Sequence, residues 1–151
     1  MGLWDNIKST TAEWSKNLKI TASQLKNDKF ADGSMAICAL VAAADGTIDA
    51  DERKKTADLI VSNDLLECFD ADELKTRFDK FCDKVEKDFD FGKISLLQTI
   101  GKVRGKDSEA RALIQIGIII GGADGHFDPD EKKVVSDSCR SLGLDPGEFD
   151  L

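Results

Sequence analysis

The sequence predicts a single all-α domain of about seven helices, with two pseudo-symmetric helical halves. Apolar residues recur at helical spacing along the chain, and no segment alternates apolar and polar residues over the length of a strand. Two stretches, residues 44–54 and 123–133, share seven of eleven residues at an offset of 79. Because internal similarity at a fixed offset indicates related structural units, we expect any functional site to be built from both stretches.

The first half is expected to hold three helices. The first, within residues 1–29, is amphipathic, and its apolar face consists of Trp4, Ile7, Thr11, Trp14, Leu18, Thr21 and Leu25. A second helix is expected from about Asp32 to Ala44. The third starts at Asp49 and should point four side chains inward: Thr56, Leu59, Ile60 and Val61.

The remaining segments are also predicted to be helical. A fourth helix begins at Asp70 or Asp72, and its apolar face is Leu74, Phe78, Phe81, Cys82 and Val85. A fifth begins at Asp90, and its apolar face is Ile94, Leu97, Ile100 and Val103. A sixth is expected over 107–123, a seventh over 128–142, and a final helical turn at 145–148, where Pro146 takes the first position.

Helix capping explains much of the repeated motif. Asp49 with Glu52, and Asp128 with Glu131, have the spacing of a capping box. Gly46 and Gly125 suit the left-handed residue that follows a helix. Just before each motif stand small residues, 42–44 and 121–123, which indicate that the two preceding helices pack closely near a pseudo-twofold axis.

Capping leaves four motif carboxylates unexplained: Asp45, Asp51, Asp124 and Asp130. Eight carboxylates near one axis repel each other unless a cation or solvent screens them, and Ca²⁺ or Mg²⁺ prefers such oxygen ligands. The motif is not an EF-hand, because Val41, Ala43, Ile120 and Gly122 fall where its first ligands belong. Two interpretations therefore stay open: a metal site made of two half-loops, or capping residues with solvated acids.

Composition excludes several classes of function. The net charge of −8 disfavours nucleic acid as a partner, and it is uneven, since residues 1–30 carry +2 and the other 121 residues carry −10. The four cysteines form no CxxC pair and there is one histidine, so we expect free thiols, no structural zinc and a reducing cytoplasm. No apolar run is long enough to cross a bilayer. No catalytic constellation is visible, so we expect no enzyme activity.

The doubled Asp-Gly-x-[Ile/Phe]-Asp-x-Asp-Glu-[Arg/Lys]-Lys motif and the ending Ser-Leu-Gly-Leu-Asp-Pro-Gly-Glu-Phe resemble the bacterial tellurite-resistance family TerB. The resemblance covers essentially the whole chain, as a helix over 1–29 and a TerB-like domain over 30–151. It implies a cytoplasmic role in resistance to tellurite and related stresses, beside membrane and calcium-binding products of the same gene cluster. It also implies a divalent metal, with ligands carried over to Asp45, Asp49, Glu52, Asp124, Asp128 and Glu131, and with Asp51 and Asp130 as second choices.

Two functions follow as hypotheses. The first is a non-enzymatic, metal-binding interaction module of a resistance complex that is peripheral to the inner membrane, with other tellurite-resistance proteins, including an inner-membrane protein, as partners. The alternative is a metal-free acidic helical scaffold that binds a basic partner protein. The apolar stripe of residues 1–29 has three candidate surfaces: its own domain, a partner helix or a membrane.

Overall fold

The computed structural model describes residues 27–123 and 125–151, and within them every regular element is helical. The elements are α3 (Asp28–Ala42), α4 (Ala50–Val61), η1 (Asp64–Leu66), α5 (Ala71–Lys87), α6 (Phe89–Gly101), α7 (Asp107–Gly121), α8 (Pro129–Ser141) and η2 (Pro146–Phe149). The all-α prediction is confirmed. The predicted amphipathic stripe of the N-terminal helix, from Trp4 to Leu25, lies outside the described residues.

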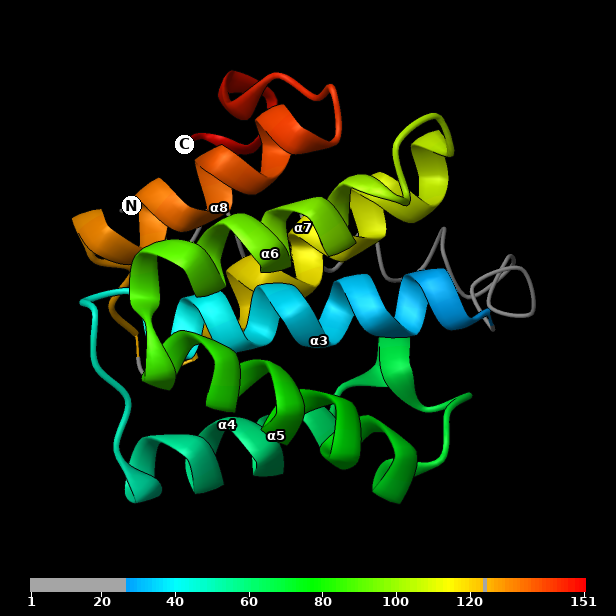
Figure 1. Cartoon of the computed structure of the whole chain (residues 1–151). Coiled ribbons are helices and arrows are strands. Elements are labelled where there is room, and N and C mark those ends of the chain that lie inside the picture. The colour runs from blue at the N-terminus through cyan, green and yellow to red at the C-terminus, as the bar shows by residue number, and fades with distance from the viewer. Residues whose placement is uncertain (1–26, 124) are drawn as a thin grey trace.

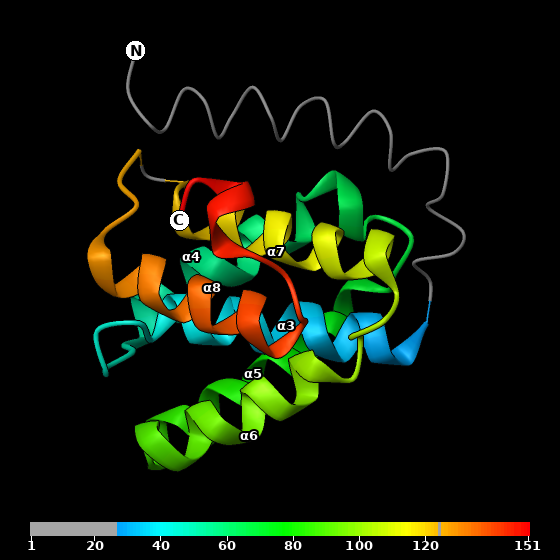
Figure 2. The same cartoon turned by 90° about the horizontal axis from the view of Figure 1, so that it is seen from above.

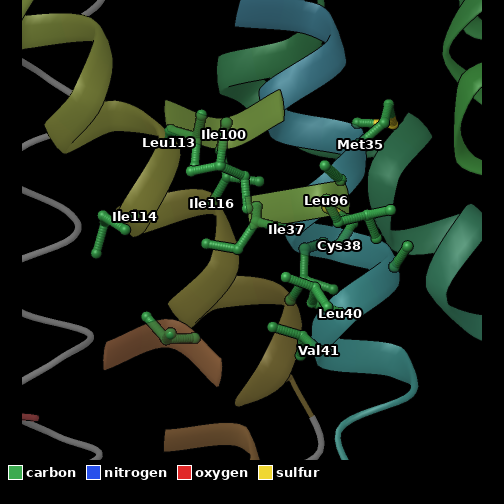
Figure 3. Close-up of a cluster of buried hydrophobic side chains, with 14 of the residues drawn as sticks. Met35, Ile37, Cys38, Leu40, Val41, Leu96, Ile100, Leu113, Ile114 and Ile116 are labelled. Carbon is green, nitrogen blue, oxygen red and sulfur yellow. The ribbon is translucent and has the colours of Figure 1, made fainter. Parts of the chain in front are cut away.

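Helix α3 is the centre of the fold. It packs against all five other described α-helices, with α4 and α5 below it and α6, α7 and α8 above it in Figure 1. Eleven of its fifteen residues are buried. Side chains of α3, α6 and α7 meet in one cluster, among them Ile37, Ile100 and Leu113 (Figure 3). Burial of such side chains supplies most of the stability of a small domain.

The two predicted halves share their helix boundaries. Helices α3 and α7 begin at Asp28 and Asp107 and end at Ala42 and Gly121, which is the 79-residue offset at both ends. The helices after the two motifs, α4 and α8, begin at Ala50 and Pro129 with the same offset. Figure 2 shows α3 and α7 side by side.

Small residues bring α3 and α7 into close contact. A Cβ atom built on Gly33 would lie 2.6 Å from Leu113 Cδ1, and one built on Gly117 would lie 2.6 Å from Ile37 Cδ1. One built on Gly121 would lie 2.9 Å from Val41 Cγ1. Each glycine thus receives a large side chain of the opposite helix. Of the small residues from which close packing was predicted, Gly121 makes such a contact, whereas Gly33 and Gly117 were not part of that prediction.

Asparagine and aspartate side chains set most helix starts. The N-caps Asn27, Asp49, Asn63, Asp70, Asp88, Asp128 and Asp145 each accept a hydrogen bond from a backbone N–H within the following turn. At α7 the N-cap position is Lys106, and no side chain caps it. These caps confirm the starts predicted for α4, α5, α8 and the final turn.

Two predicted starts were wrong for the same reason. Helix α3 begins at Asp28 and not at Asp32, because Asn27 Oδ1 accepts from Phe30 N at 2.9 Å. Helix α6 begins at Phe89, because Asp88, two residues before the expected Asp90, accepts from Phe91 N at 3.1 Å. At the other end, α3 and α7 stop two residues short of the predicted Ala44 and Ala123. An amphipathic pattern does not show which of several polar residues forms the cap.

Two side chains predicted to be buried are exposed. Val61 and Ile94 are each 54% exposed. On α6 the buried face is Gly92, Leu96 and Ile100, and Leu97 is only partly buried. A Cβ at Gly92 would lie 2.8 Å from the backbone of Lys84 and Val85 in α5, so the glycine allows the two helices to touch. The close approach turns α6 so that Ile94 faces outward. The stripe predicted for α5 is buried throughout.

Candidate functional site

The two acidic motifs adopt the same turn after their helices. Gly46 and Gly125 have φ angles of 94° and 86°, the left-handed conformation that glycine adopts without steric cost. Gly46 N donates to Ala43 O at 2.8 Å, and Gly125 N donates to Gly122 O at 3.0 Å. The predicted role of both glycines in ending a helix is thereby confirmed.

The next helix of each half starts with the predicted cap. Asp49 Oδ1 accepts from Glu52 N and Asp128 Oδ1 accepts from Glu131 N, both at 2.8 Å. In the second motif the box is reciprocal, since Glu131 Oε1 accepts from Asp128 N at 3.2 Å. Pro129 takes the first helical position there.

The two motifs line one shared groove, which we call the inter-motif groove. Its volume is about 370 Å³. Its walls are the end of α3, one face of α4, the end of α7 and the start of α8: Val41, Ala42, Ala44, Asp45, Glu52, Lys55, Thr56, Leu59, Ile120, Gly121, Ala123, Asp128 and Glu131. The expectation that a site would draw on both copies therefore has a structural basis.

Four of the six predicted ligands line this groove: Asp45, Glu52, Asp128 and Glu131. Asp49 caps α4 and is not part of the lining, and Asp124 lies outside the described residues. The second choices, Asp51 and Asp130, are exposed in the first turns of α4 and α8, away from the lining.

The carboxylates of the first motif repel each other. Partial burial, followed by the charges of Asp49 and Asp45, raises the pKa of Glu52 above its ordinary value, while Lys55 acts in the opposite direction. Asp45 is fixed locally, because its Oδ1 accepts from Thr47 N at 3.0 Å and from Thr47 Oγ1 at 3.1 Å. The groove therefore holds excess negative charge, with Lys55 as a counter-charge in its lining.

The oxygen donors suit a hard divalent cation, but they are spread along the groove. Within 27–123 and 125–151, no three Asp, Glu, His or Cys side chains come close enough together to hold a metal ion. Asp45 and Glu52 are exposed, so Glu52 has room to rotate, and Asp45 can rotate once its hydrogen bonds from Thr47 are broken. Thr56 and Leu59 were predicted on the inward face of the third helix, but neither they nor Lys55 were included in the predicted site. With Glu52 these residues follow the i, i+3, i+4, i+7 spacing of one helix face.

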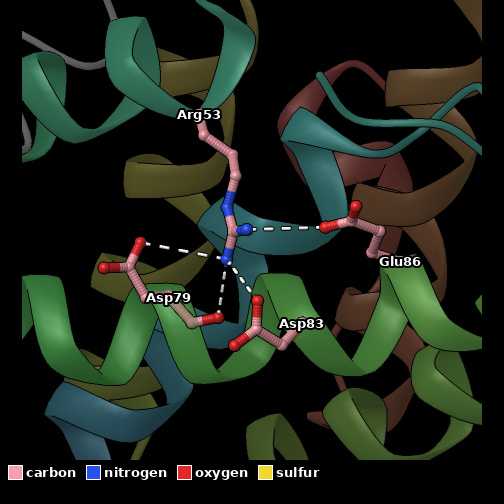
Figure 4. Close-up of polar contacts among 4 residues, drawn as sticks. All are labelled: Arg53, Asp79, Asp83 and Glu86. Carbon is pink, nitrogen blue, oxygen red and sulfur yellow. Dashed lines mark hydrogen bonds and ion pairs between the residues drawn. The ribbon is translucent and has the colours of Figure 1, made fainter. Parts of the chain in front are cut away.

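A second groove, of about 660 Å³, lies between α4 and α5. Arg53 is one of its lining residues, and its side chain reaches from α4 to acidic residues of α5 (Figure 4). Its Nη2 donates to Asp79 O and Asp83 Oδ1, both at 2.8 Å, and its Nη1 donates to Glu86 Oε2 at 3.4 Å. Desolvation alone would lower the pKa of Arg53, but the hydrogen bond and charge of Asp83 raise it overall. Arg53 therefore ties α4 to α5, a role that the sequence pattern did not indicate.

The cysteines are free thiols, as predicted. Cys38, Cys82 and Cys139 are buried and Cys68 is partly buried. Burial raises the pKa of all three buried thiols, to about 12 for Cys82 and Cys139. Since the thiolate is the reactive form, these three groups act as apolar core residues.

Taken together, the fold and the groove define a small all-helical domain in which an acidic helix–loop–helix is present twice. The chain belongs to the TerB family: the family described as "Tellurite resistance protein TerB" matches residues 31–151. A similar relative is a tellurium resistance protein TerB from Alcaligenes sp., 25% identical over 118 residues, which are 78% of this chain and 97% of the relative. No solved structure matches the chain. Membership of this family points to a role related to tellurite resistance.

No helix in the described part of the chain is both long and apolar enough to cross a bilayer. The family match begins at residue 31, close to the predicted domain start at residue 30. The division into 1–29 and 30–151 stays a prediction, and α3 begins two residues before that boundary.

Proposed function

We propose that the inter-motif groove binds one divalent cation, Ca²⁺ or Mg²⁺, through carboxylates of both motifs. Asp45 and Glu52 would serve from the first half, and Asp128 and Glu131 from the second. Asp49 and Asp124 complete the set expected from the sequence. The observation that carries this proposal is that both acidic motifs, far apart in sequence, line the same groove.

Electrostatics gives the groove a reason to take up a cation. Partial burial and then the charges of Asp49 and Asp45 raise the pKa of Glu52, and a cation among these groups would offset both effects. Carboxylate oxygens are the ligands that Ca²⁺ and Mg²⁺ prefer. Since no three described donors converge, binding would require Asp45 and Glu52 to rotate toward the start of α8.

Such a cation would connect the two halves of the domain. The ligands of the first motif lie after α3 and on α4, and those of the second lie at the start of α8. A bound ion would hold α4 and α8 at a fixed separation and reduce the negative charge between them. We infer a non-enzymatic interaction module in tellurite resistance, whose binding surface is set by the cation. Its partners would be other tellurite-resistance proteins, among them an inner-membrane protein.

The alternative is an acidic scaffold that needs no metal and binds a basic partner protein. The net charge of −10 over residues 31–151 favours it, as does the exposure of Asp51 and Asp130 outside the groove. In that case the acidic groups would pair with lysine or arginine side chains of the partner, and binding would persist in a chelator and weaken with salt.

Thermal unfolding tests the cation site. The full chain is unfolded in EDTA and then in millimolar Ca²⁺, Mg²⁺ or Mn²⁺. A ligand at about 100 times its dissociation constant adds about 2.7 kcal/mol to the free energy of unfolding, which is a shift of several degrees in Tm for a domain of this size. Asp45→Asn combined with Glu52→Gln should abolish the shift.

A matched control separates the groove from general charge effects. Asp51→Asn combined with Asp130→Asn also removes two motif carboxylates, but neither residue lines the groove, so this variant should keep the shift. Equal loss in both double variants would show screening of surface charge and not a site. No shift with any ion in the wild type would contradict the cation site and favour the acidic scaffold.

A further inference from the structure

One side of α6 is apolar although it is exposed to solvent. Phe91 is 75% exposed, and Ile94, which lies one turn further along, is 54% exposed. Gln98 continues the same side of the helix and is also exposed. We call Phe91, Ile94 and Gln98 the outer face of α6. Figure 2 shows α6 at an edge of the described body.

The outer face of α6 carries no charge between Asp90 and the end of the helix. Lys93 is the other charged residue of α6, and its Nζ lies 2.8 Å from Asp137 Oδ2 in a largely buried ion pair with α8. By contrast, most exposed residues of α5 are charged. A helix that is apolar on all sides is usually covered on all sides, and neighbouring exposed apolar side chains mark interaction surfaces.

The two ends of α6 carry opposite charges. At the start, Asp88 and Asp90 are exposed and outweigh the neighbouring Lys87. At the end, Lys102 at the C-cap and Arg104 in the following loop are exposed. Lys102 comes one turn after the last residue of the outer face, so the basic end lies in line with that face.

This distribution of charge selects the occupant of the outer face. An anionic membrane would attract the basic end of α6 but repel the acidic end, and a uniformly charged partner helix would also match one end only. A second α6 laid antiparallel matches both ends. Centred at the level of residue 96, it brings Asp90 opposite Lys102 and Ile94 opposite Gln98, and a twofold axis repeats each pair.

We propose that two copies of this chain associate through the outer faces of antiparallel α6 helices. The contact buries Phe91 and Ile94 of both copies and places Asp90 of each copy beside Lys102 of the other. The net charge of −8 on each chain opposes association, so the dimer is weak and dissociates on dilution. The proposal goes beyond the cation site and does not depend on it, since no residue of α6 lines the inter-motif groove.

Sedimentation equilibrium of the full chain in EDTA tests this contact. Between low micromolar and millimolar concentration, the mass should rise from 16.5 kDa toward twice that value. Ile94→Lys places a charge at the centre of the contact and should weaken the dimer roughly tenfold or more. The matched control is Val61→Lys on α4, because Val61 is also 54% exposed, and it should leave the dissociation constant unchanged.

Charge reversal tests the antiparallel arrangement. Asp90→Lys and Lys102→Glu should each weaken the dimer, because each places like charges opposite one another twice, and the two changes combined should restore it. A mass of 16.5 kDa up to millimolar concentration would overturn the proposal, even if the monomer then sedimented with phosphatidylglycerol vesicles, which would assign the face to a membrane. A dimer that Ile94→Lys leaves intact, or a double reversal that restores nothing, would also overturn it.

Discussion

The two halves of the domain share a motif but are fastened to the rest of the fold in different ways. Helix α4 buries only Thr56 and Ile60, and Arg53 ties it to α5. Helix α8 buries Val134, Val135, Ser138 and Cys139, and Asp137 ties it to Lys93 of α6 at 2.8 Å. A basic residue anchors one half, and an acidic residue anchors the other.

The difference shows what the repeat does and does not specify. Caps, turns and the ends of the preceding helices agree in both copies, because they are formed within a few residues of chain. The anchors differ, because α5 and α6 lie between the two copies and each half meets a different one of them. The inter-motif groove thus has one wall, α4, with two buried residues and the Arg53 anchor, and another, α8, with four buried residues and the Asp137 anchor.

The largest loss of stability is expected for a substitution at the contact between α3 and α7, where the two halves meet. Gly117→Val would place side-chain atoms against Ile37 and Val135, since a Cβ there already lies 2.6 Å from Ile37 Cδ1. Overpacking of this kind costs about 2 to 3 kcal/mol, or roughly 5–10 °C in Tm. Urea unfolding followed by circular dichroism measures it. Gly101→Ala is the control, because its Cβ would meet only Ser141 O at 3.5 Å, and an equal loss there would contradict close packing as the cause.

A smaller loss of stability is expected from substitutions at Arg53 and Lys132, which occupy the same position in the two motifs. Arg53→Met removes the ion pairs to α5 and leaves three acidic side chains facing each other, which should cost about 1 kcal/mol and about 2–4 °C in Tm. Lys132→Met should change the free energy of unfolding by less than about 0.5 kcal/mol. Thermal unfolding of both variants compares the two halves at one motif position. Equal decreases in Tm for the two variants would mean that the ion pairs of Arg53 with α5 do not stabilise the protein.

The third prediction concerns the pH dependence of the α8 anchor. Burial alone would raise the pKa of Asp137, but Lys93 and Lys133 lower it below its ordinary value of 3.8. A lowered pKa in the folded state stabilises the protein above pH 3.8, and this contribution is lost as the pH falls through the folded pKa. Asp137→Asn should therefore cost about 1 kcal/mol at pH 7 and progressively less as the pH falls below 3.8. A cost that stays constant with pH, in unfolding measured from pH 3 to 7, would contradict the ion-pair explanation.

Glu52 in the first half should affect stability with the opposite pH dependence to that of Asp137. Its pKa is raised from 4.5, so its ionised form destabilises the folded state above that pH. In EDTA, Glu52→Gln should be neutral or slightly stabilising at pH 7, by at most about 0.5 kcal/mol, with no difference at low pH. A clear loss at pH 7 without any cation would show that Glu52 makes a stabilising contact in the metal-free protein.

Local features of the fold were predictable from the sequence. The capping spacing of Asp49 and Asp128 and the glycines after α3 and α7 gave the turns and helix starts of both motifs. The starts of α3 and α6 were missed because several Asx residues stand near each end, and the pattern does not rank them. Ile94 was misassigned because a glycine, Gly92, and not an apolar side chain marks the contact with α5.

The candidate site was predictable in part. The repetition of the acidic motif indicated that both copies would contribute, and Asp45, Glu52, Asp128 and Glu131 do line one groove. Asp49 was predicted as a cap, but the exclusion of its side chain from the lining, and the presence of Lys55 in it, depend on how α4 is rotated. Metal binding itself stays a prediction, to be tested with the groove variants.

By itself, the sequence determined the helical class, the two related halves and the local geometry of each motif. These follow from hydrogen bonds and dihedral preferences that act within a few residues. The tertiary structure alone decided which face of α4 and α6 is buried, which residues anchor each half and that the two motifs share a groove. Those outcomes depend on contacts between different helices, where a single glycine allows two helices to touch and a single arginine ties one helix to another.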